Sequence, residues 1–220
     1  MIKAVIFDLD GVIADSEPFS AEADDILLAR YGIRKTEQER RDMYGRRFEE
    51  IYGDILRARG LDLDIKELFE AKSVIFRGLI RGRLKPIRNS LELIGFFQKK
   101  GFLTALATSS HLAKALPEMR ELGIERLFGI IVSGDEVKAG KPDPEIFLRA
   151  SVKLGVLPKE CAVIEDSAFG VRAAKAAGMF AIAFRSPNTP NQDLSKADLV
   201  VGELLEAKEY FCRQMKGGLC

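Results

Sequence analysis

The chain has 220 residues, of which 47% are hydrophobic and 30% charged, and its formal net charge at pH 7 is +1. This length allows one well-buried domain and a small second one. A net charge near zero gives no overall field that would attract nucleic acid or an anionic membrane surface, and no apolar run approaches the roughly 20 residues of a membrane helix. We therefore expect no nucleic-acid or membrane partner. Because Met1 leads straight into a strand without a signal-peptide pattern, we expect a cytoplasmic location.

The first predicted strand ends in two acidic residues. Residues 3–9 read KAVIFDL, an apolar and β-prone stretch, and Asp8 and Asp10 stand at its end. Burying two neighbouring carboxylates is costly unless something compensates their charge. A solvated Asp-Gly turn is one explanation. A bound cation, or a reaction that uses both acids, is the other.

Residues 16–84 have helical periodicity and no strand pattern. Ser16 is the predicted N-cap of the first helix, and Asp64 with Glu67 forms a capping-box signature before the last one. The predicted helices cover residues 16–32, 36–45, 48–60 and 64–86. The pattern predicts an all-helical cap domain at 16–84, inserted after the first strand, while 1–15 and 85–220 form the main domain.

In the remainder of the chain, short apolar strands alternate with helices. Strands are predicted at 102–108, 128–134, 161–166, 180–185 and 198–201, and helices at 90–101, 111–123, 143–155, 167–178 and 202–217. Continuous apolar strands that alternate with helices predict a parallel sheet covered on both faces. We therefore predict an α/β fold with a doubly wound, Rossmann-like core.

In such a sheet, ligands bind at the carboxyl ends of the strands. Thr108 and Ser109 follow the second predicted strand, and Glu165 and Asp166 end the fourth. Lys141 lies in the loop KAGKPDP between them. Hydroxyls, lysine and the N–H groups at helix starts bind phosphate, whereas clustered carboxylates bind a hard cation such as Mg²⁺. These residues therefore predict a site for a phosphate group and Mg²⁺ together.

Four stretches occur in the order of a known set of motifs: DLDGV, LTALAT, GKPDP and IEDSAFG. With them the chain resembles the haloacid dehalogenase superfamily, in the β-phosphoglucomutase-like branch of phosphatases and mutases that carry a helical cap after the first motif. The resemblance spans essentially the whole chain. It implies a Mg²⁺-dependent phosphatase that acts on small phosphorylated metabolites, such as sugar phosphates, through an aspartyl-phosphate. We expect a monomer.

The resemblance also assigns roles to the residues at the strand ends. Asp8 would be the nucleophile, Asp10 the general acid and base, and Lys141 would neutralise Asp8 and the transferring group. Mg²⁺ would be held by Asp8, Asp166 and the backbone carbonyl of Asp10. Glu165 would bind the metal directly, act through water, or only orient its neighbours.

Thr108, through its hydroxyl, and Ser109, through its backbone N–H, would bind the phosphoryl oxygens. Ser109 has an alternative role as an ordinary helix N-cap. Arg46 and Arg47, in the predicted cap, are candidates for contact with a second anionic or hydroxyl-rich group of the substrate, although composition alone favours solvated side chains. His111, the one histidine, is expected at a helix start rather than in catalysis.

Two alternatives to a phosphatase stay open. A sugar-phosphate mutase would use the same core residues. Against it, Ser20 stands where β-phosphoglucomutases carry a histidine in the first cap helix. A non-catalytic module that binds a phosphorylated metabolite is the other alternative, and the intact set of Asp8, Asp10, Lys141 and Asp166 disfavours it.

Overall fold

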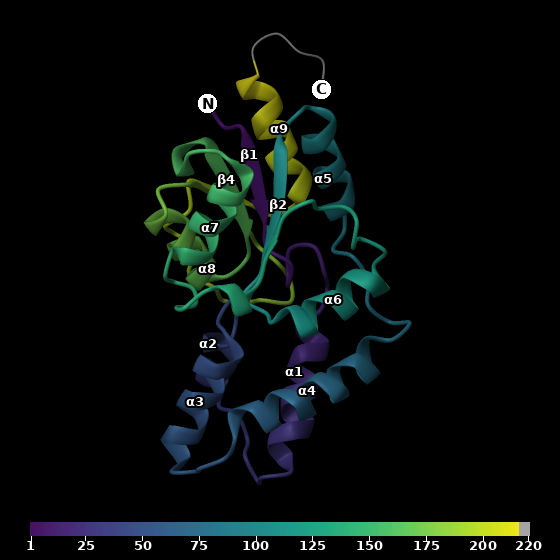
Figure 1. The fold of residues 1–220 in the computed structure, drawn as a ribbon, viewed down its shortest axis with the longest axis vertical. Coiled ribbons are helices and arrows are strands. Elements are labelled where there is room, and N and C mark those ends of the chain that lie inside the picture. The colour runs from purple at the N-terminus through teal and green to yellow at the C-terminus, as the bar shows by residue number, and fades with distance from the viewer. Residues whose placement is uncertain (216–220) are drawn as a thin grey trace.

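A parallel sheet forms the centre of the larger part of the molecule (Figure 1). The structure, a computed structural model, describes residues 1–215, so the predicted end of the last helix at Gly217 lies outside this range. The six strands have the order β3-β2-β1-β4-β5-β6, and all neighbours run parallel. Their bounds are β1 Ala4–Phe7, β2 Leu103–Ala107, β3 Ile131–Val132, β4 Cys161–Glu165, β5 Phe180–Phe184 and β6 Leu199–Val201. Every predicted strand is present.

Helices cover both faces of this sheet. Val5 and Phe7 of β1 point into a core shared with α5 (Ser90–Lys99), α6 (Leu112–Glu121) and α9 (Leu204–Gln214). Ala4 and Ile6 point the other way, toward α7 (Glu145–Leu154) and α8 (Ala168–Ala176). The predicted doubly wound α/β fold is confirmed. The sequence pattern did not predict the two short 3₁₀ helices at Gly134–Glu136 and Pro158–Glu160.

Four further helices, which we call the helical insert, lie beyond the carboxyl ends of the strands, at the opposite end from the N-terminus (Figure 1). They are α1 (Glu17–Ala29), α2 (Glu37–Asp42), α3 (Phe48–Arg59) and α4 (Ile65–Ile80). Of these, α1, α3 and α4 enclose a small core of their own, which includes Leu27, Tyr52 and Leu68. None of the helices in residues 1–215 has the length and apolarity needed to cross a membrane.

The two capping predictions for the insert have different outcomes. Asp64 caps α4 as expected, because its carboxylate accepts hydrogen bonds from the backbone N–H groups of Lys66 and Glu67. Ser16 occupies the N-cap position of α1, but its side chain makes no capping hydrogen bond. The predicted N-cap position of Ser16 is confirmed, but Ser16 does not cap the helix through its side chain, because its hydroxyl donates to Asp10 instead, at 2.6 Å.

The chain enters and leaves the insert along two adjacent segments. Ala14 and Pro86 form an isolated antiparallel bridge. The Ile87 N–H donates to the Ile13 carbonyl at 2.8 Å, and the Asp15 N–H donates to the Lys85 carbonyl at 3.0 Å. This pairing fixes where the insert begins and ends relative to β1. The division of the chain into two domains at these crossings stays a prediction.

Candidate active site

The end of β1 opens into a tight turn that places two acids at the edge of the sheet. The Asp8 N–H donates to the Ile164 carbonyl at 3.0 Å, which extends the pairing of β1 with β4 by one residue. Gly11 then adopts a φ of +75°, and a Cβ built there would lie 2.0 Å from Asp166 Oδ2. Only glycine allows the turn and the carboxylate of Asp166 to come so close.

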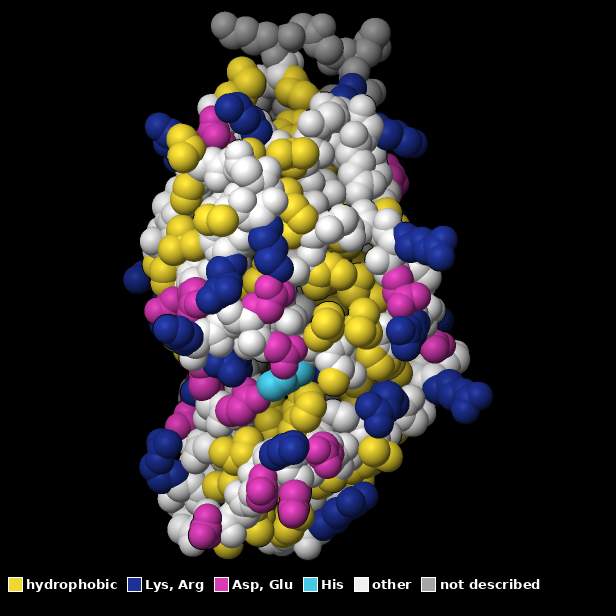
Figure 2. Space-filling view, viewed as in Figure 1, with side chains coloured by type: hydrophobic (Ala, Val, Ile, Leu, Met, Phe, Trp, Pro, Cys, Tyr) yellow, Lys and Arg dark blue, Asp and Glu magenta, His cyan; other side chains and the backbone are white. Residues whose placement is uncertain are grey.

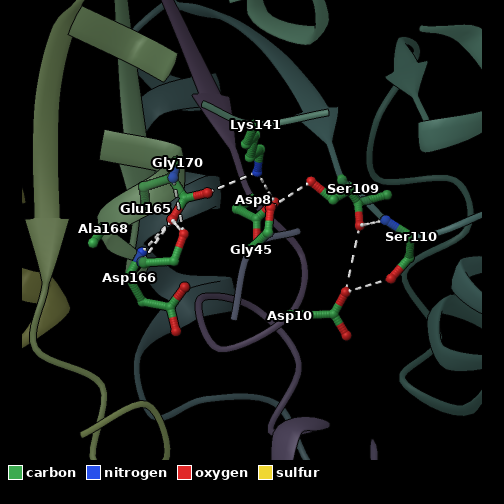
Figure 3. A network of polar contacts seen from close by, with 12 residues as sticks. Asp8, Asp10, Gly45, Ser109, Ser110, Lys141, Glu165, Asp166, Ala168 and Gly170 are labelled. Atoms are coloured by element: carbon green, nitrogen blue, oxygen red, sulfur yellow. Dashed lines mark hydrogen bonds and ion pairs between the residues drawn. The ribbon is translucent and has the colours of Figure 1, made fainter. Parts of the chain in front are cut away.

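Asp8 belongs to a buried group of four charged residues, the Asp8 cluster, with Lys141, Glu165 and Asp166 (Figure 3). Lys141 Nζ donates to Asp8 Oδ1 and to Glu165 Oε1, both at 2.7 Å. Carboxylate oxygens of the three acids all lie within 4.8 Å of one another. Three carboxylates and one ammonium group carry a formal charge of −3 + 1 = −2.

This charge deficit appears in the pKa values. Burial raises the pKa of Asp8 to about 8, against the lowering effect of Lys141 and with a further rise from Glu165. Burial and the charges of Glu165 and Asp8 also hold the pKa of Asp166 well above its ordinary value. The surrounding protein therefore does not balance the carboxylates by itself. A divalent cation would supply the missing charge, and carboxylate oxygens suit a hard ion of this kind.

Within the Asp8 cluster, Glu165 and Asp166 differ in their free oxygens. Glu165 Oε1 accepts from Lys141, and Oε2 accepts from the N–H groups of Asp166 and Ser167 and from the Ser167 hydroxyl. Asp166 accepts one hydrogen bond, from the Thr189 hydroxyl to Oδ2 at 2.7 Å. The oxygens of Asp166 are therefore the more available of the two to a cation, while Glu165 anchors Lys141 and the start of α8.

Asp10 lies in a second polar group, the Asp10 cluster, with Ser16, Ser110 and Lys114. Its Oδ1 accepts from Ser16 Oγ at 2.6 Å and from Lys114 Nζ at 2.7 Å, and its Oδ2 accepts from Ser110 Oγ at 2.9 Å. Burial alone would raise the pKa of Asp10. The charge of Lys114 and these hydrogen bonds outweigh burial and lower the pKa below its ordinary value. Figure 3 shows Asp10 directed toward Ser110 and away from Asp166.

The sequence reasoning missed Lys114. It lies on α6, outside the four motifs, and it also pairs with the fully buried Glu118 at 2.8 Å. The two acids together raise the pKa of Lys114 although burial would lower it. The sequence held one indication of this role. Lys114 lies in the first turn of the helix that follows the polar end of the second strand, four residues before Glu118.

Thr108 and Ser109 are both buried at the end of β2. Thr108 Oγ1 accepts from the Ser110 N–H at 3.1 Å and faces Asp10 Oδ2 at 3.4 Å. The backbone N–H of Ser109 has no hydrogen-bond partner among residues 1–215. The alternative of Ser109 as an ordinary N-cap is wrong, because the N-cap of α6 is His111.

The helical insert closes over these strand ends and leaves a cleft of about 130 Å³, lined from both sides by residues that include Asp8 and Asp10. Ser109 Oγ donates to the Gly45 carbonyl at 2.8 Å, and the Gly140 N–H donates to Glu50 Oε1 at 3.0 Å. The insert is thus in hydrogen-bond contact with the loops that carry the site.

The two predicted arginines have different positions. Arg46 lines the cleft, where it pairs with Asp54 at 2.7 Å. Arg47 donates from Nη1 to the carbonyls of Val137 and Lys138, at 3.3 and 3.1 Å, and is not part of the cleft lining. Arg47 therefore attaches the insert to the loop before Lys141.

His111 joins the two parts of the molecule as well. It is the N-cap of α6, as expected, and its two ring nitrogens contact Glu49 of the insert and Asp135 of the sheet region. Acidic side chains gather around the histidine where the two parts meet (Figure 2). The hydrogen bond to Glu49 raises the pKa of His111.

Comparison with known proteins places this chain in a family. Residues 5–184 match the model of the haloacid dehalogenase-like hydrolases. The chain belongs to this family. The family predicted from the four motifs is thereby confirmed.

Three relatives illustrate the range of this family. The chain is 38% identical to a phosphorylated carbohydrates phosphatase of Thermotoga maritima, over 81% of this chain and 82% of that protein. It is 32% identical to a fructose-1-phosphate phosphatase of Escherichia coli, over 82% of this chain and 95% of the relative. Its fold matches a β-phosphoglucomutase of Clostridium difficile with a TM-score of 0.85 at 27% identity, covering 97% of this chain and 96% of the other.

Proposed function

We propose that this protein is a metal-dependent phosphatase that hydrolyses phosphorylated carbohydrates through an aspartyl-phosphate on Asp8. The observation that carries this proposal is the buried Asp8 cluster, in which a carboxylate at a strand end shares one lysine with Glu165 and lies close to a third acid, Asp166. Two relatives named as phosphatases of phosphorylated sugars support the substrate class. A cytoplasmic location and a monomeric state stay predictions from the sequence.

The donor set around Asp8 fits Mg²⁺. Asp8, Asp166 and the backbone carbonyl of Asp10 would hold the ion, and Glu165 would orient Lys141 and Asp166 through the hydrogen bonds described above. When bound, the ion neutralises charge on a phosphoryl oxygen and so favours attack by an anionic nucleophile.

In the first step, an Asp8 carboxylate oxygen attacks phosphorus. The new O–P bond forms as the P–O bond to the leaving alcohol breaks, and protonated Asp10 transfers its proton to the departing alkoxide. Lys141, 2.7 Å from Asp8, balances the negative charge that gathers there. The Ser109 N–H and the Thr108 hydroxyl would donate to the phosphoryl oxygens.

In the second step, the ionised Asp10 removes a proton from water as the water oxygen attacks phosphorus. The acyl O–P bond breaks, phosphate leaves, and both the Asp8 carboxylate and the proton on Asp10 are regenerated. Asp10 is held as a carboxylate by Lys114, Ser16 and Ser110, which is the state this second step requires.

The mutase alternative uses the same first step and differs in the acceptor of the phosphoryl group. Ser20 lines the cleft and accepts a hydrogen bond from Lys72 at 3.2 Å. A serine hydroxyl cannot carry the charge of an imidazolium, so closure of the insert would not be linked to proton transfer through this position. This supports the hydrolase.

The proposal is tested by incubating the protein with β-glucose 1-phosphate, Mg²⁺ and a trace of glucose 1,6-bisphosphate. We expect release of inorganic phosphate without glucose 6-phosphate, and loss of activity in EDTA that Mg²⁺ restores. Rapid formation of glucose 6-phosphate with negligible phosphate release would instead identify a mutase. Failure to hydrolyse any phosphate monoester, p-nitrophenyl phosphate included, together with no formation of glucose 6-phosphate, would leave only a binding module.

A further inference from the structure

Beyond the phosphate end, the cleft is lined by cationic side chains that are already paired. Each of these side chains lies within 4.0 Å of at least one carboxylate. They are Lys35, Arg40, Arg46, Lys72, Lys114 and His111. None of the cations in this described lining is therefore left over for a second anionic group of a substrate.

The pairing is tightest at the inner end of the cleft. Asp24 is buried in the insert, where its Oδ1 lies 2.6 Å from Lys72 Nζ and accepts from the Tyr52 hydroxyl at 2.6 Å. Lys35 lies 3.5 Å from the other oxygen of Asp24. Withdrawing Lys72 to meet a ligand would leave a buried carboxylate short of its partner. Lys72 is therefore held by Asp24 within the insert. Its ammonium group also donates to the Ser20 hydroxyl, so it offers no free charge to a ligand.

Glu17 is the exception among the charged residues of the cleft. It begins α1, lines the cleft, and makes no hydrogen bond or ion pair with any of residues 1–215. The cleft lining places Glu17 together with Asp8 and Asp10 of the strand end and with Ser20 and Lys72 of the insert. In the proposed mechanism, the leaving group of a phosphate ester would occupy this cleft beside Glu17. Because Glu17 has no hydrogen-bond donor among residues 1–215, a bound ligand could supply one.

We propose that Glu17 is a specificity-determining residue that accepts a hydrogen bond from a hydroxyl of the leaving group. The preferred substrate is then the monophosphate of a neutral polyhydroxylic compound without a second anionic group. This inference rests on the proposed function. A second phosphate or a carboxylate on the substrate would lie beside the Glu17 carboxyl group and would find no unpaired cation. A hydroxyl group would instead donate a hydrogen bond to Glu17. Sites built to hydrogen-bond a hydroxyl reject analogues that lack it.

The surroundings of Glu17 agree with this assignment. Burial raises its pKa to about 7, with a further contribution from the charge of Asp10. In a partly buried site of low local dielectric, a carboxyl group gains more from a hydroxyl donor than it would in water.

The first experiment uses the wild-type protein with Mg²⁺ and compares kcat/KM for three classes of ester. These are hexose monophosphates, hexose bisphosphates or phosphoglycolate, and p-nitrophenyl phosphate. We expect kcat/KM for the hexose monophosphates to exceed that for the esters with a second anionic group by about 10-fold or more. This is the scale of one hydrogen bond to a charged group. An equal or higher kcat/KM for the esters with a second anionic group would overturn the inference, and this test needs no variant.

The second experiment compares Glu17→Ala and Glu17→Gln with Glu22→Gln, a matched change at an exposed position of the same helix. For Glu17→Ala, we expect kcat/KM for hexose monophosphates to fall about 10- to 100-fold relative to that for p-nitrophenyl phosphate. Glu22→Gln should keep the wild-type ratio. An unchanged ratio in Glu17→Ala would overturn the inference.

A set of deoxy analogues of the best hexose phosphate locates the hydroxyl. In the wild type, one deoxy analogue should be a poorer substrate by about 10-fold or more, and Glu17→Ala should use it as well as the parent sugar, because both changes remove the same hydrogen bond. Additive losses would contradict the contact. A wild type that hydrolyses p-nitrophenyl phosphate but shows none of these differences refutes the inference alone. A wild type inactive on every ester refutes the proposed function.

Discussion

Asp8 and Asp10 leave the same strand end one residue apart, yet their surroundings are opposite. Around Asp8, three buried carboxylates lie together with one cation, Lys141, which pairs with two of them, and burial raises the pKa of Asp8 to about 8. Around Asp10, two serine hydroxyls and Lys114 donate to a single carboxylate, and its pKa is lowered despite burial. The Asp8 cluster therefore lacks positive charge, whereas the carboxylate of Asp10 already has its hydrogen-bond donors and a cation.

This difference separates the roles of two chemically identical side chains. In the proposed mechanism, a divalent cation and the phosphoryl group that it helps to bind would complete the Asp8 cluster. The Asp10 cluster is complete in itself and keeps Asp10 ionised, the form that accepts a proton. To donate a proton in the proposed first step, Asp10 would have to leave Lys114 and turn toward the leaving group. The two clusters can therefore be perturbed independently.

The largest expected effect comes from removing the nucleophile. Asp8→Asn should lower kcat for p-nitrophenyl phosphate by at least about 10⁴-fold, because no carboxylate remains to attack phosphorus. The fold should survive, since the change removes one of three mutually repelling carboxylates. Steady-state hydrolysis and circular dichroism check both points, with Asp62→Asn at an exposed position as the matched control. Activity within 10-fold of the wild type would exclude Asp8 as the nucleophile.

The next largest effect separates proton transfer from nucleophilic attack. In Asp10→Asn, the first turnover of an alkyl phosphate should slow by about 10²- to 10⁴-fold, the usual contribution of a general acid. The first turnover of p-nitrophenyl phosphate should slow much less, because p-nitrophenolate leaves without a proton. Rapid-quench measurement of both esters provides the comparison. An equal loss on the two esters would remove the distinction between the roles of Asp8 and Asp10.

Two lysine variants test the electrostatic contrast itself. Lys141→Met and Lys114→Met each leave buried carboxylates unpaired, and each should lower the free energy of unfolding by about 3–5 kcal/mol. Mg²⁺ should recover a large part of this loss in Lys141→Met, because the ion replaces positive charge in the Asp8 cluster. It should recover little in Lys114→Met. Urea titrations with Mg²⁺ or EDTA measure the difference, and equal recovery in both variants would show that the clusters are not distinct.

The smallest expected effect concerns His111, at the start of the helix that carries Lys114. Its hydrogen bond to Glu49 raises its folded-state pKa above the ordinary 6.5. The resulting stabilisation is fully present below pH 6.5 and is lost as the pH rises through the raised pKa. Because His111 and its two acidic partners are partly exposed to solvent, the effect on Tm should be no more than about 3 °C. Thermal melts across this range should show a steeper fall in the wild type than in His111→Gln. Identical pH profiles would exclude this contribution.

The sequence could predict the sheet and the acids at its strand ends because both follow from local patterns. Continuous apolar strands that end in Asp8, Thr108 and Glu165 fix the edge at which these residues meet, whatever the packing elsewhere. Lys114 could not be found in this way. Its partner Asp10 is 104 residues away in the chain, and only the packing of α6 against the end of β1 brings them together.

The same limit applied to the helical insert. Ser16 had the residue type of an N-cap, but a tertiary contact with Asp10 took its hydroxyl. Arg47 reads as a solvated or ligand-binding arginine, yet it donates to backbone carbonyls of a loop about 90 residues later. Glu17 carried no signal because its lack of a partner is a property of the folded cleft.

The central claim is that Asp8 takes the phosphoryl group while Asp10 moves protons, and the phosphoenzyme tests it most directly. Asp10→Asn with Mg²⁺ and p-nitrophenyl phosphate should release about one equivalent of p-nitrophenol rapidly and then stall, because no base remains to activate water. Acid quenching and fragment mass spectrometry should then locate one phosphoryl group on Asp8. A phosphoryl group on any other residue, or the absence of both burst and phosphoenzyme, would contradict the account.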